Sequence, residues 1–284
     1  MIAKSNTHWF AVVLCLIWAA SQQSRADEPA ADTNTTERQA LLKEMRAGVA
    51  AIQVSEKVGD QIHSAKLVEE PLFRYSDEQR QIRDATMWAW TVQGQPVSLM
   101  KVERYGFPDL RRKWLFNVGS TSSALLDVKW PFEREFTSKK PGMTFQSLPD
   151  ALKAAENKPT RLMLLKQLSR RFTATMLGGA TDESRSEMRL LPTPLYRYVS
   201  EANEILDGAL FGFSSTGTNP DAILAIQLCG TEVKSAEWKF AVAGMTTGGL
   251  QVRLDEKQVW SQPLLVGQRP DFETWTWFFS ERVE

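Results

Sequence analysis

The sequence predicts an α+β fold made by tandem duplication, in which each copy is one helix followed by an antiparallel β-meander whose curved sheet packs on that helix. Two observations support this prediction. The pentapeptide Pro71–Tyr75 recurs 123 residues later as Pro194–Tyr198. In both copies, apolar residues at helical spacing precede the pentapeptide and apolar residues that alternate at strand spacing follow it.

The N-terminus is predicted to be an export signal. An apolar run occupies residues 9–20, and residues 24–26 (Ser-Arg-Ala) have the small-x-small pattern of a cleavage site. We expect cleavage after Ala26 and a secreted or periplasmic protein. The run is shorter than the roughly 20 apolar residues that span a bilayer, so no integral membrane segment is expected in the mature chain. Residues 27–36 are polar and are predicted to be a flexible lead-in.

The first unit is predicted to span residues 37–130. Thr36 and Gln39 fit a capping box at the start of its helix, and Met45 and Val49 belong to one apolar stripe. The second unit, residues 159–284, repeats this pattern: Asn157 is the expected helix cap and Pro159 falls in the first turn. Residues 131–158 are predicted to connect the two units.

The strands are predicted from alternation. Trp88 and Trp90 alternate with smaller residues in the first copy, and Phe211 and Phe213 take the equivalent places in the second. A closing strand is expected around Trp275 and Trp277. The remaining strands are expected near residues 97–104, 113–119 and 124–130, and near residues 221–228, 237–243 and 249–255.

The composition excludes some classes of protein. The chain has 284 residues, 43% of them hydrophobic, with 34 Lys+Arg against 34 Asp+Glu, as in an ordinary globular protein. Because nucleic-acid-binding domains usually carry a basic face, no nucleic-acid partner is expected. The sequence has no phosphate-binding loop, dinucleotide fingerprint, nucleophile elbow or zinc-protease motif, so no cofactor, metal or catalytic residue is predicted.

Polar residues shared by the copies are the first candidates for a ligand site. Arg74 and Asp84 recur as Arg197 and Asp207. A guanidinium suits an anionic ligand and an aspartate can act as a general base, which leaves a carboxylate-dependent hydrolase as one alternative. The plainer interpretation is that both pairs belong to the scaffold, because a scaffold feature would be retained in each copy.

Tryptophan is the other candidate, because the chain holds 10 of them. Most fall at strand spacing and are expected in the core. Trp275 and Trp277 have no counterpart in the first copy, so they are candidates for a contact surface.

Three stretches of the second copy carry a resemblance: residues 188–198 (MRLLPTPLYRY), 207–211 (DGALF) and 217–220 (GTNP). In these stretches, and in the strand of Trp88 and Trp90, the chain resembles a group of functionally uncharacterised secreted proteins of planctomycete-type bacteria. The resemblance implies secretion and extends over most of the mature chain. It implies no activity, cofactor or site residue.

The function expected from these observations is that of an exported, non-enzymatic binding or structural protein, whose partner is an unknown protein or small molecule. Two alternatives remain open. One is the hydrolase that uses Asp84 or Asp207. The other is a carrier that holds an apolar ligand in the groove of a curved sheet.

Overall fold

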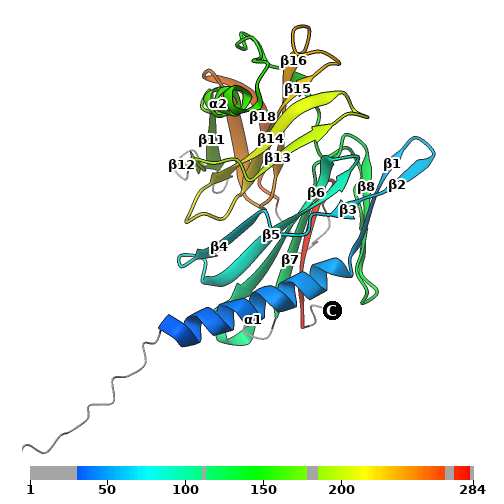
Figure 1. Ribbon diagram of the computed structural model, residues 1–284. Helices are drawn as coiled ribbons and strands as arrows, with labels where there is room; N and C mark the ends of the chain where they lie inside the picture. The colour runs from blue at the N-terminus through cyan, green and yellow to red at the C-terminus, as the bar shows by residue number, and fades with distance from the viewer. Residues whose placement is uncertain (1–30, 111–112, 178–184, 266–271, 282–284) are drawn as a thin grey trace, which may run out of the picture.

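The computed structural model describes residues 31–110, 113–177, 185–265 and 272–281. In this part of the chain the protein is mostly β, with two α-helices and antiparallel sheets, one of which curls into a half-barrel (Figure 1). The prediction of an antiparallel α+β fold is confirmed at this level. The predicted export signal, residues 1–26, lies outside the described residues.

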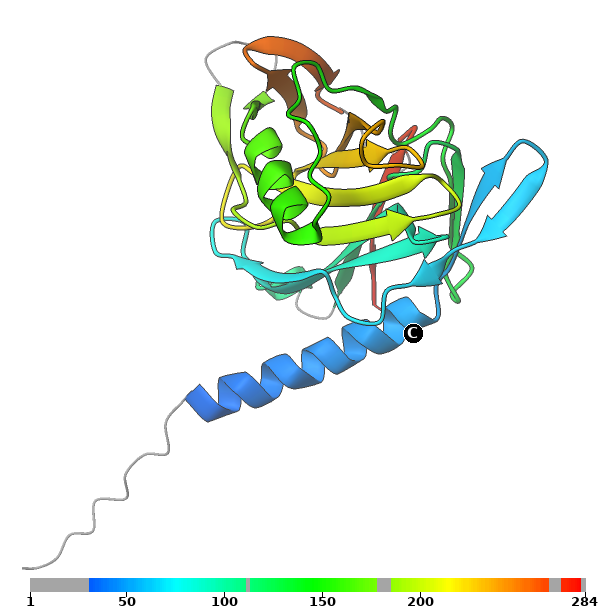
Figure 2. The same cartoon turned by 45° about the horizontal axis from the view of Figure 1, so that its top comes forward.

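Helix α1 (Ala31–Ala50) begins before the predicted position. Residues 31–36, expected in the flexible lead-in, are helical, so Thr36 lies inside the helix rather than at its cap. The segment contains no proline or glycine that would stop the helix from extending toward the N-terminus. Its first turns project away from the sheets (Figures 1 and 2), and its last turns contribute buried side chains, among them Met45 and Val49.

Two sheets form the first half of the protein. A six-stranded sheet has the order β19-β7-β6-β5-β3, with β4 also paired to β5; β19 is the C-terminal strand Trp275–Ser280. A four-stranded sheet has the order β2-β1-β8-β9. A short 3-10 helix, Pro108–Leu110, precedes β7. The strands in chain order are β1 (Gln53–Val58), β2 (Gln61–Ser64), β3 (Lys66–Leu67), β4 (Phe73–Asp77), β5 (Ile82–Val92), β6 (Gln95–Tyr105), β7 (Trp114–Ser120), β8 (Leu125–Lys129) and β9 (Glu135–Thr137).

One nine-stranded sheet curls around helix α2 (Lys158–Ser169) in the second half. Asn157 caps this helix as predicted, because its side chain accepts from the backbone N of Thr160 at 2.8 Å. The sheet order is β10-β16-β15-β14-β12-β11-β17-β18, with β13 also paired to β14. Its strands are β10 (Gln146–Ser147), β11 (Phe172–Leu177), β12 (Arg185–Leu190), β13 (Tyr196–Ser200), β14 (Ile205–Ser214), β15 (Ala222–Cys229), β16 (Glu237–Gly244), β17 (Gly249–Leu254) and β18 (Lys257–Gln262).

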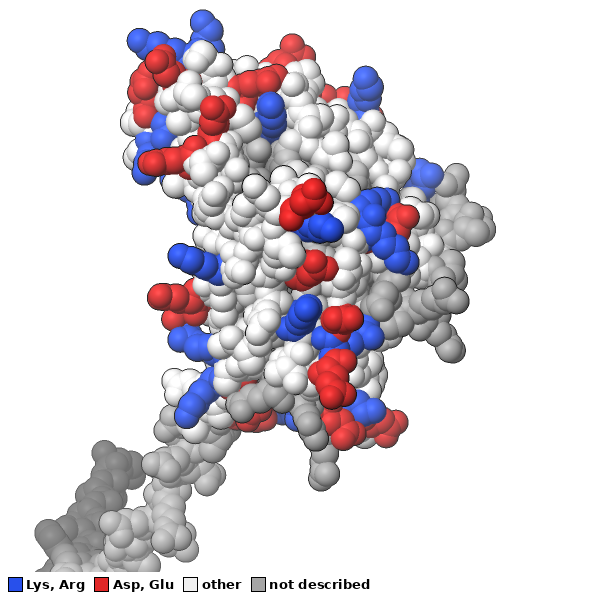
Figure 3. Space-filling view, turned by 90° about the vertical axis from the view of Figure 1, so that its right-hand side faces the viewer, with Lys and Arg blue, Asp and Glu red and all other residues white. Residues whose placement is uncertain are grey.

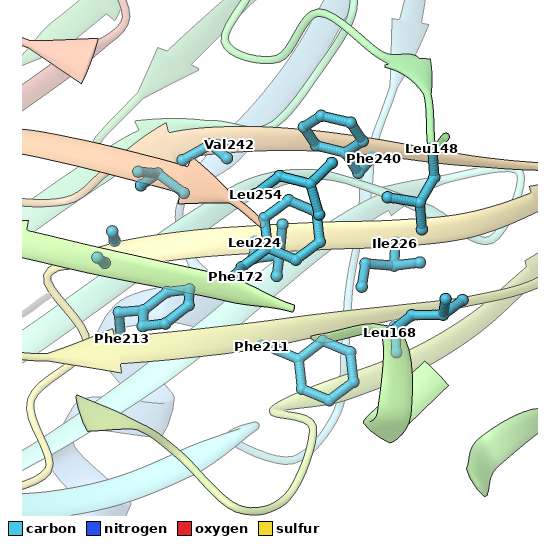
Figure 4. Packing of buried hydrophobic residues seen from close by; sticks show 14 of the residues in the cluster. Leu148, Leu168, Phe172, Phe211, Phe213, Leu224, Ile226, Phe240, Val242 and Leu254 are labelled. Atoms are coloured by element: carbon cyan, nitrogen blue, oxygen red, sulfur yellow. The ribbon is translucent and has the colours of Figure 1, made fainter. Parts of the chain in front are cut away.

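Each half has its own core on the helix-facing side of its sheets. In the first, Met45 of α1 packs with Trp88 and Trp90. In the second, Leu168 of α2 packs with Phe211 and with other apolar side chains that fill the concave face (Figure 4). Both expected helix stripes therefore pack against a sheet, as their spacing predicts.

A third core joins the halves face to face. Leu99 of β6 lies in it together with Ile223 of β15, on the sheet faces that point away from the helices. Close approaches occur near both ends of this joint. Gly94, at φ 87°, lies against the Val199 carbonyl, where an added Cβ would be 2.3 Å from the oxygen; Gly217, at φ 52°, lies against the Asp77 carboxyl group.

The C-terminal strand belongs to the first half, which corrects the predicted second unit of residues 159–284. Strand β19 (Trp275–Ser280) pairs with β7 of the first half. Conversely β10, from the predicted connection 131–158, pairs with β16 of the second half. The last strand of the chain thus returns to the first half, and the connection adds one short strand to the sheet of the second half. Alternation predicted the strand at Trp275 but carries no information about which sheet edge it joins.

Candidate functional site

The two shared Arg–Asp pairs have the same geometry. Nε of Arg74 donates to Oδ1 of Asp84 at 2.8 Å, and Nε of Arg197 donates to Oδ1 of Asp207 at the same distance. The second nitrogen of each arginine donates to the other carboxylate oxygen and to a backbone carbonyl of the helix, at Arg38 or Lys158. Each pair therefore ties the helix of its half to strands of the same half.

Both carboxylates are buried in these interactions. The Asp84 and Asp207 side chains are each 1% exposed, and Arg161 of helix α2 also donates to Asp207. A hydrolytic pair needs carboxylates that face an open cleft and a water or substrate. The geometry of the pairs instead supports the scaffold interpretation.

Trp275 and Trp277 lie two residues apart on one face of strand β19. Neither Arg–Asp pair lies on this strand. Trp275 is buried, stacks on Phe272 with ring centroids 5.1 Å apart, and donates its indole N–H to Asn117. Trp277 is half-buried, and its Nε1 atom is buried without a hydrogen-bond partner among the described residues. Both tryptophans line one cavity.

This cavity, which we call the joint pocket, has a volume of about 260 Å³ and lies between the two halves. Strand register places three rows of residues on one face of the first sheet, and all of them except Leu99 and Gly119 line the floor of the pocket. They are Leu99, Gly119 and Trp275; Lys101, Asn117 and Trp277; and Glu103, Leu115 and Phe279. The opposite wall comes from the second half, through Asn219, Asp221 and residues 245–247.

Lys101 is buried in the middle row, 1% exposed. Its Nζ donates to Oδ1 of Asn219 at 2.9 Å and to the carbonyl oxygens of Pro220 and Met245, each at 3.0 Å. Burial lowers the pKa of Lys101, and Glu103 and Asp221 partly oppose this shift. All three acceptors belong to the second half, so this ammonium group joins the halves.

Glu103 accepts two phenolic hydroxyl groups. The Tyr75 hydroxyl donates to Oε1 at 2.5 Å and the Tyr105 hydroxyl to Oε2 at 3.0 Å. Burial, and then the charge of Glu103, raise the pKa of both tyrosines. Both phenols therefore stay protonated and serve as donors to the carboxylate at neutral pH.

Arg80 and Asp221 form a two-pronged ion pair across the joint. The two terminal nitrogens of Arg80 donate to Oδ1 and Oδ2 of Asp221 at 2.8 and 2.9 Å, and Ser215 donates to Oδ2 as well. Burial raises the pKa of Asp221, but the hydrogen bonds from Arg80 and the nearby charge of Lys101 outweigh it, so the net shift is downward.

The lowered pKa of Asp221 predicts a contribution to stability that depends on pH. An unfolded aspartate titrates near 3.9, so the ionised form stabilises the fold fully above that pH. This contribution is lost as the pH falls through the lower folded-state pKa. In urea denaturation between pH 6 and pH 2.5, Asp221→Asn is expected to flatten the fall in the free energy of unfolding, whereas Asp60→Asn, on an exposed turn, should keep the wild-type slope. Equal slopes for wild type and Asp221→Asn would contradict the assignment.

The charged residues of the joint pocket were not among the sequence candidates. Lys101 and Glu103 alternate with Met100 and Val102, a pattern that is typical of a strand with one solvated face. The signal that could have found them is the difference between the two stretches that align in the sequence. With the one-residue shift that aligns Trp114 with Trp238, Lys101 falls on Ala225, Glu103 on Gln227 and Asn117 on Ala241.

The face shown in Figure 3 carries positive and negative side chains interspersed, with no broad field of one sign. Within the described ranges, no three His, Cys, Asp or Glu side chains come together as metal ligands would. The described helices include none that combines the length and the apolar character needed to cross a membrane.

Comparisons with protein-family models, with curated proteins and with solved structures found no match for this chain.

Proposed function

We propose that this is an exported, non-enzymatic binding protein that holds a small ligand in the joint pocket. The observation that carries the proposal is the pocket itself. It lies between two packed halves, a frequent place for ligand sites, and it combines aromatic side chains with a few buried polar groups held in place by other residues. Export rests on the signal predicted in residues 1–26.

The two other functions considered above have less support. The carboxylates of Asp84 and Asp207 are engaged by arginines rather than facing a cleft. An apolar carrier would need free space on the concave face of the second sheet, but the protein's own side chains fill that face (Figure 4). A hollow of about 370 Å³ lies beside Phe172 and Phe213, but four charged residues also line it, and a wholly apolar ligand would desolvate them. The four are Arg170, Glu187, Arg253 and Glu256.

Native mass spectrometry of the mature chain tests the binding function. The protein is incubated with a defined mixture of neutral hexoses, amino acids, nucleosides and small carboxylic acids. One class is expected to form a one-to-one complex. Trp277→Phe should weaken that complex about tenfold, because it removes the buried indole N–H while keeping an aromatic ring in the pocket.

Trp260→Phe is the matched control, because Trp260 packs on the core of the second half, away from the joint pocket. It should leave the complex unchanged. If no component of the mixture binds, or if both variants bind as the wild type does, the proposed function is wrong.

We also propose that the two halves are copies of one ancestral unit. The Arg–Asp pairs support this, because they repeat at the displacement of 123 residues. The strand register supports it as well: Asp84 lies opposite Arg104 and Asp207 opposite Leu228, positions that correspond after the one-residue shift. Backbone at Gln81 and Glu204, again 123 residues apart, has φ of 54° and 51°.

Contacts across the joint support a symmetric origin. Arg80 of the first half binds the segment that holds Ser215 and Asp221. Its counterpart, Asn203, donates to Gln95 at 2.9 Å at the corresponding place in the first half. Reciprocal contacts of this kind are those of a two-fold dimer interface. An experimental structure in which the two Arg–Asp pairs did not superpose would contradict the duplication.

A further inference from the structure

The chemistry of the joint pocket also bears on its ligand, an inference that rests on the proposed function. The charged groups that line the pocket balance each other: Arg80 and Lys101 are positive, and Glu103 and Asp221 are negative. The N–H groups of Lys101 are committed to three acceptors, and both oxygens of Asp221 accept hydrogen bonds. A charged ligand would lose hydration without gaining a free ionic partner in either of these groups.

Hydrogen-bonding capacity nevertheless remains for a neutral ligand. A carboxylate offers about four lone-pair positions, and Glu103 uses three of them, for the hydroxyl groups of Tyr75 and Tyr105 and, at 3.5 Å, for the side-chain amide of Asn219. The Nε1 atom of Trp277 is a buried donor without a partner among the described residues. The pocket lining therefore holds one remaining acceptor position at Glu103 and, in Trp277, one donor without a partner among the described residues.

The aromatic side is fixed by contacts between rings. Phe279 meets Tyr105 edge to face at 6.0 Å between centroids, and meets Trp277 in the same way at 5.9 Å. Tyr105 also stacks on Phe107 at 6.1 Å. These rings give the ligand a rigid apolar surface beside the polar side chains of Lys101, Glu103 and Asn117.

The size restricts the ligand to a small molecule. At about 260 Å³ the joint pocket lies just below the range of roughly 300–1,000 Å³ that holds drug-sized ligands. A single ring with its substituents fits such a volume, whereas an extended chain would have to lie mostly outside it.

From these four properties we infer that the joint pocket binds one neutral sugar ring. One hydroxyl group of the sugar donates to Glu103 and another accepts from Trp277, while a C–H face of the ring lies on the aromatic side. The ring can be a free monosaccharide or the terminal residue of a longer glycan, because both present the same chemistry.

Isothermal titration of the mature chain with a charge series tests this inference. The probes are neutral hexoses, the matching uronic acids and the matching 2-amino sugars, at pH 7. At least one neutral hexose is expected to bind ten times more tightly than either charged counterpart. Methyl glycosides and short oligosaccharides of the same sugar separate the two sources: a free monosaccharide site loses affinity with these probes, and a site for glycan ends keeps it.

Glu103→Gln is the variant that tests Glu103 as the acceptor of a sugar hydroxyl group. The matched position in the second half already holds Gln227, which accepts from the Tyr198 hydroxyl at 3.0 Å, so the substitution has a precedent in the same fold. It is expected to lower hexose affinity about tenfold with an unchanged circular dichroism spectrum. Gln227→Asn, outside the pocket, is the control and should bind as the wild type does.

The outcomes separate this inference from the proposed function. Tighter binding of a uronic acid or an amino sugar would overturn the neutral-sugar assignment. Binding of an amino acid, nucleoside or carboxylic acid without any hexose would also overturn it and leave the binding function standing. Failure of every probe in both experiments would overturn both.

Discussion

Replacing Lys101 with methionine is expected to lower the free energy of unfolding by about 3–5 kcal/mol, the usual effect of removing one partner from a buried charged group. Methionine keeps much of the side-chain volume, so the change isolates the ammonium group. It leaves the Asn219 amide oxygen and the Pro220 carbonyl buried without this donor, whereas the Met245 carbonyl keeps the hydrogen bond from Asn117. The measurement is a urea denaturation curve at neutral pH, followed by tryptophan fluorescence and by circular dichroism.

The control is Lys257→Met, at an exposed position of strand β18. Such surface substitutions usually change stability by less than about 0.5 kcal/mol. If Lys101→Met changed stability as little as this control, the ammonium group would not hold the halves together, and the account of the joint given above would fail.

Trp275→Ala is the second large effect, expected to lower the free energy of unfolding by about 3–5 kcal/mol. Trp275 is 3% exposed, packs in the core between the halves and donates to Asn117. Because its strand follows the second half but pairs with the first, the substitution should weaken both halves together. Thermal unfolding should therefore show one transition, shifted to lower temperature.

Phe279→Ala on the same strand is the matched control. Phe279 is 37% exposed, so its truncation should cost less than half as much as that of Trp275. A thermal profile of Trp275→Ala with two separate transitions, one of them at the wild-type temperature, would contradict the view that strand β19 couples the two halves.

The shared and the unshared polar residues have different physical roles. Arg74 and Asp84, like Arg197 and Asp207, fix a helix to the strands of the same half, and this need exists in each half. Lys101 and Glu103 serve the joint instead, where the counterparts are Ala225 and Gln227. This difference explains why a search for residues shared by the two aligned stretches led to the Arg–Asp pairs rather than to the pocket.

Several local features could be predicted from the sequence because they depend on near neighbours. The alternation of Trp88 and Trp90 predicted strand β5, and Asn157 with Pro159 predicted the start of helix α2. Trp275 and Trp277 were singled out because they lack a counterpart in the first copy, and both line the pocket. The predicted start of helix α1 was wrong: the helix begins at Ala31, and residues 31–36 contain no proline or glycine that would stop it from extending toward the N-terminus.

The sequence by itself determined the strand and helix periods, the cap of the second helix and the repeated pentapeptide, all of which follow from local geometry and side-chain spacing. Only the tertiary structure decided that β19 joins the first half, that β10 joins the second, and that Lys101 and Glu103 are buried rather than solvated. The physical reason is that alternation assigns a residue to a face of a strand, whereas what covers that face depends on segments more than 100 residues away.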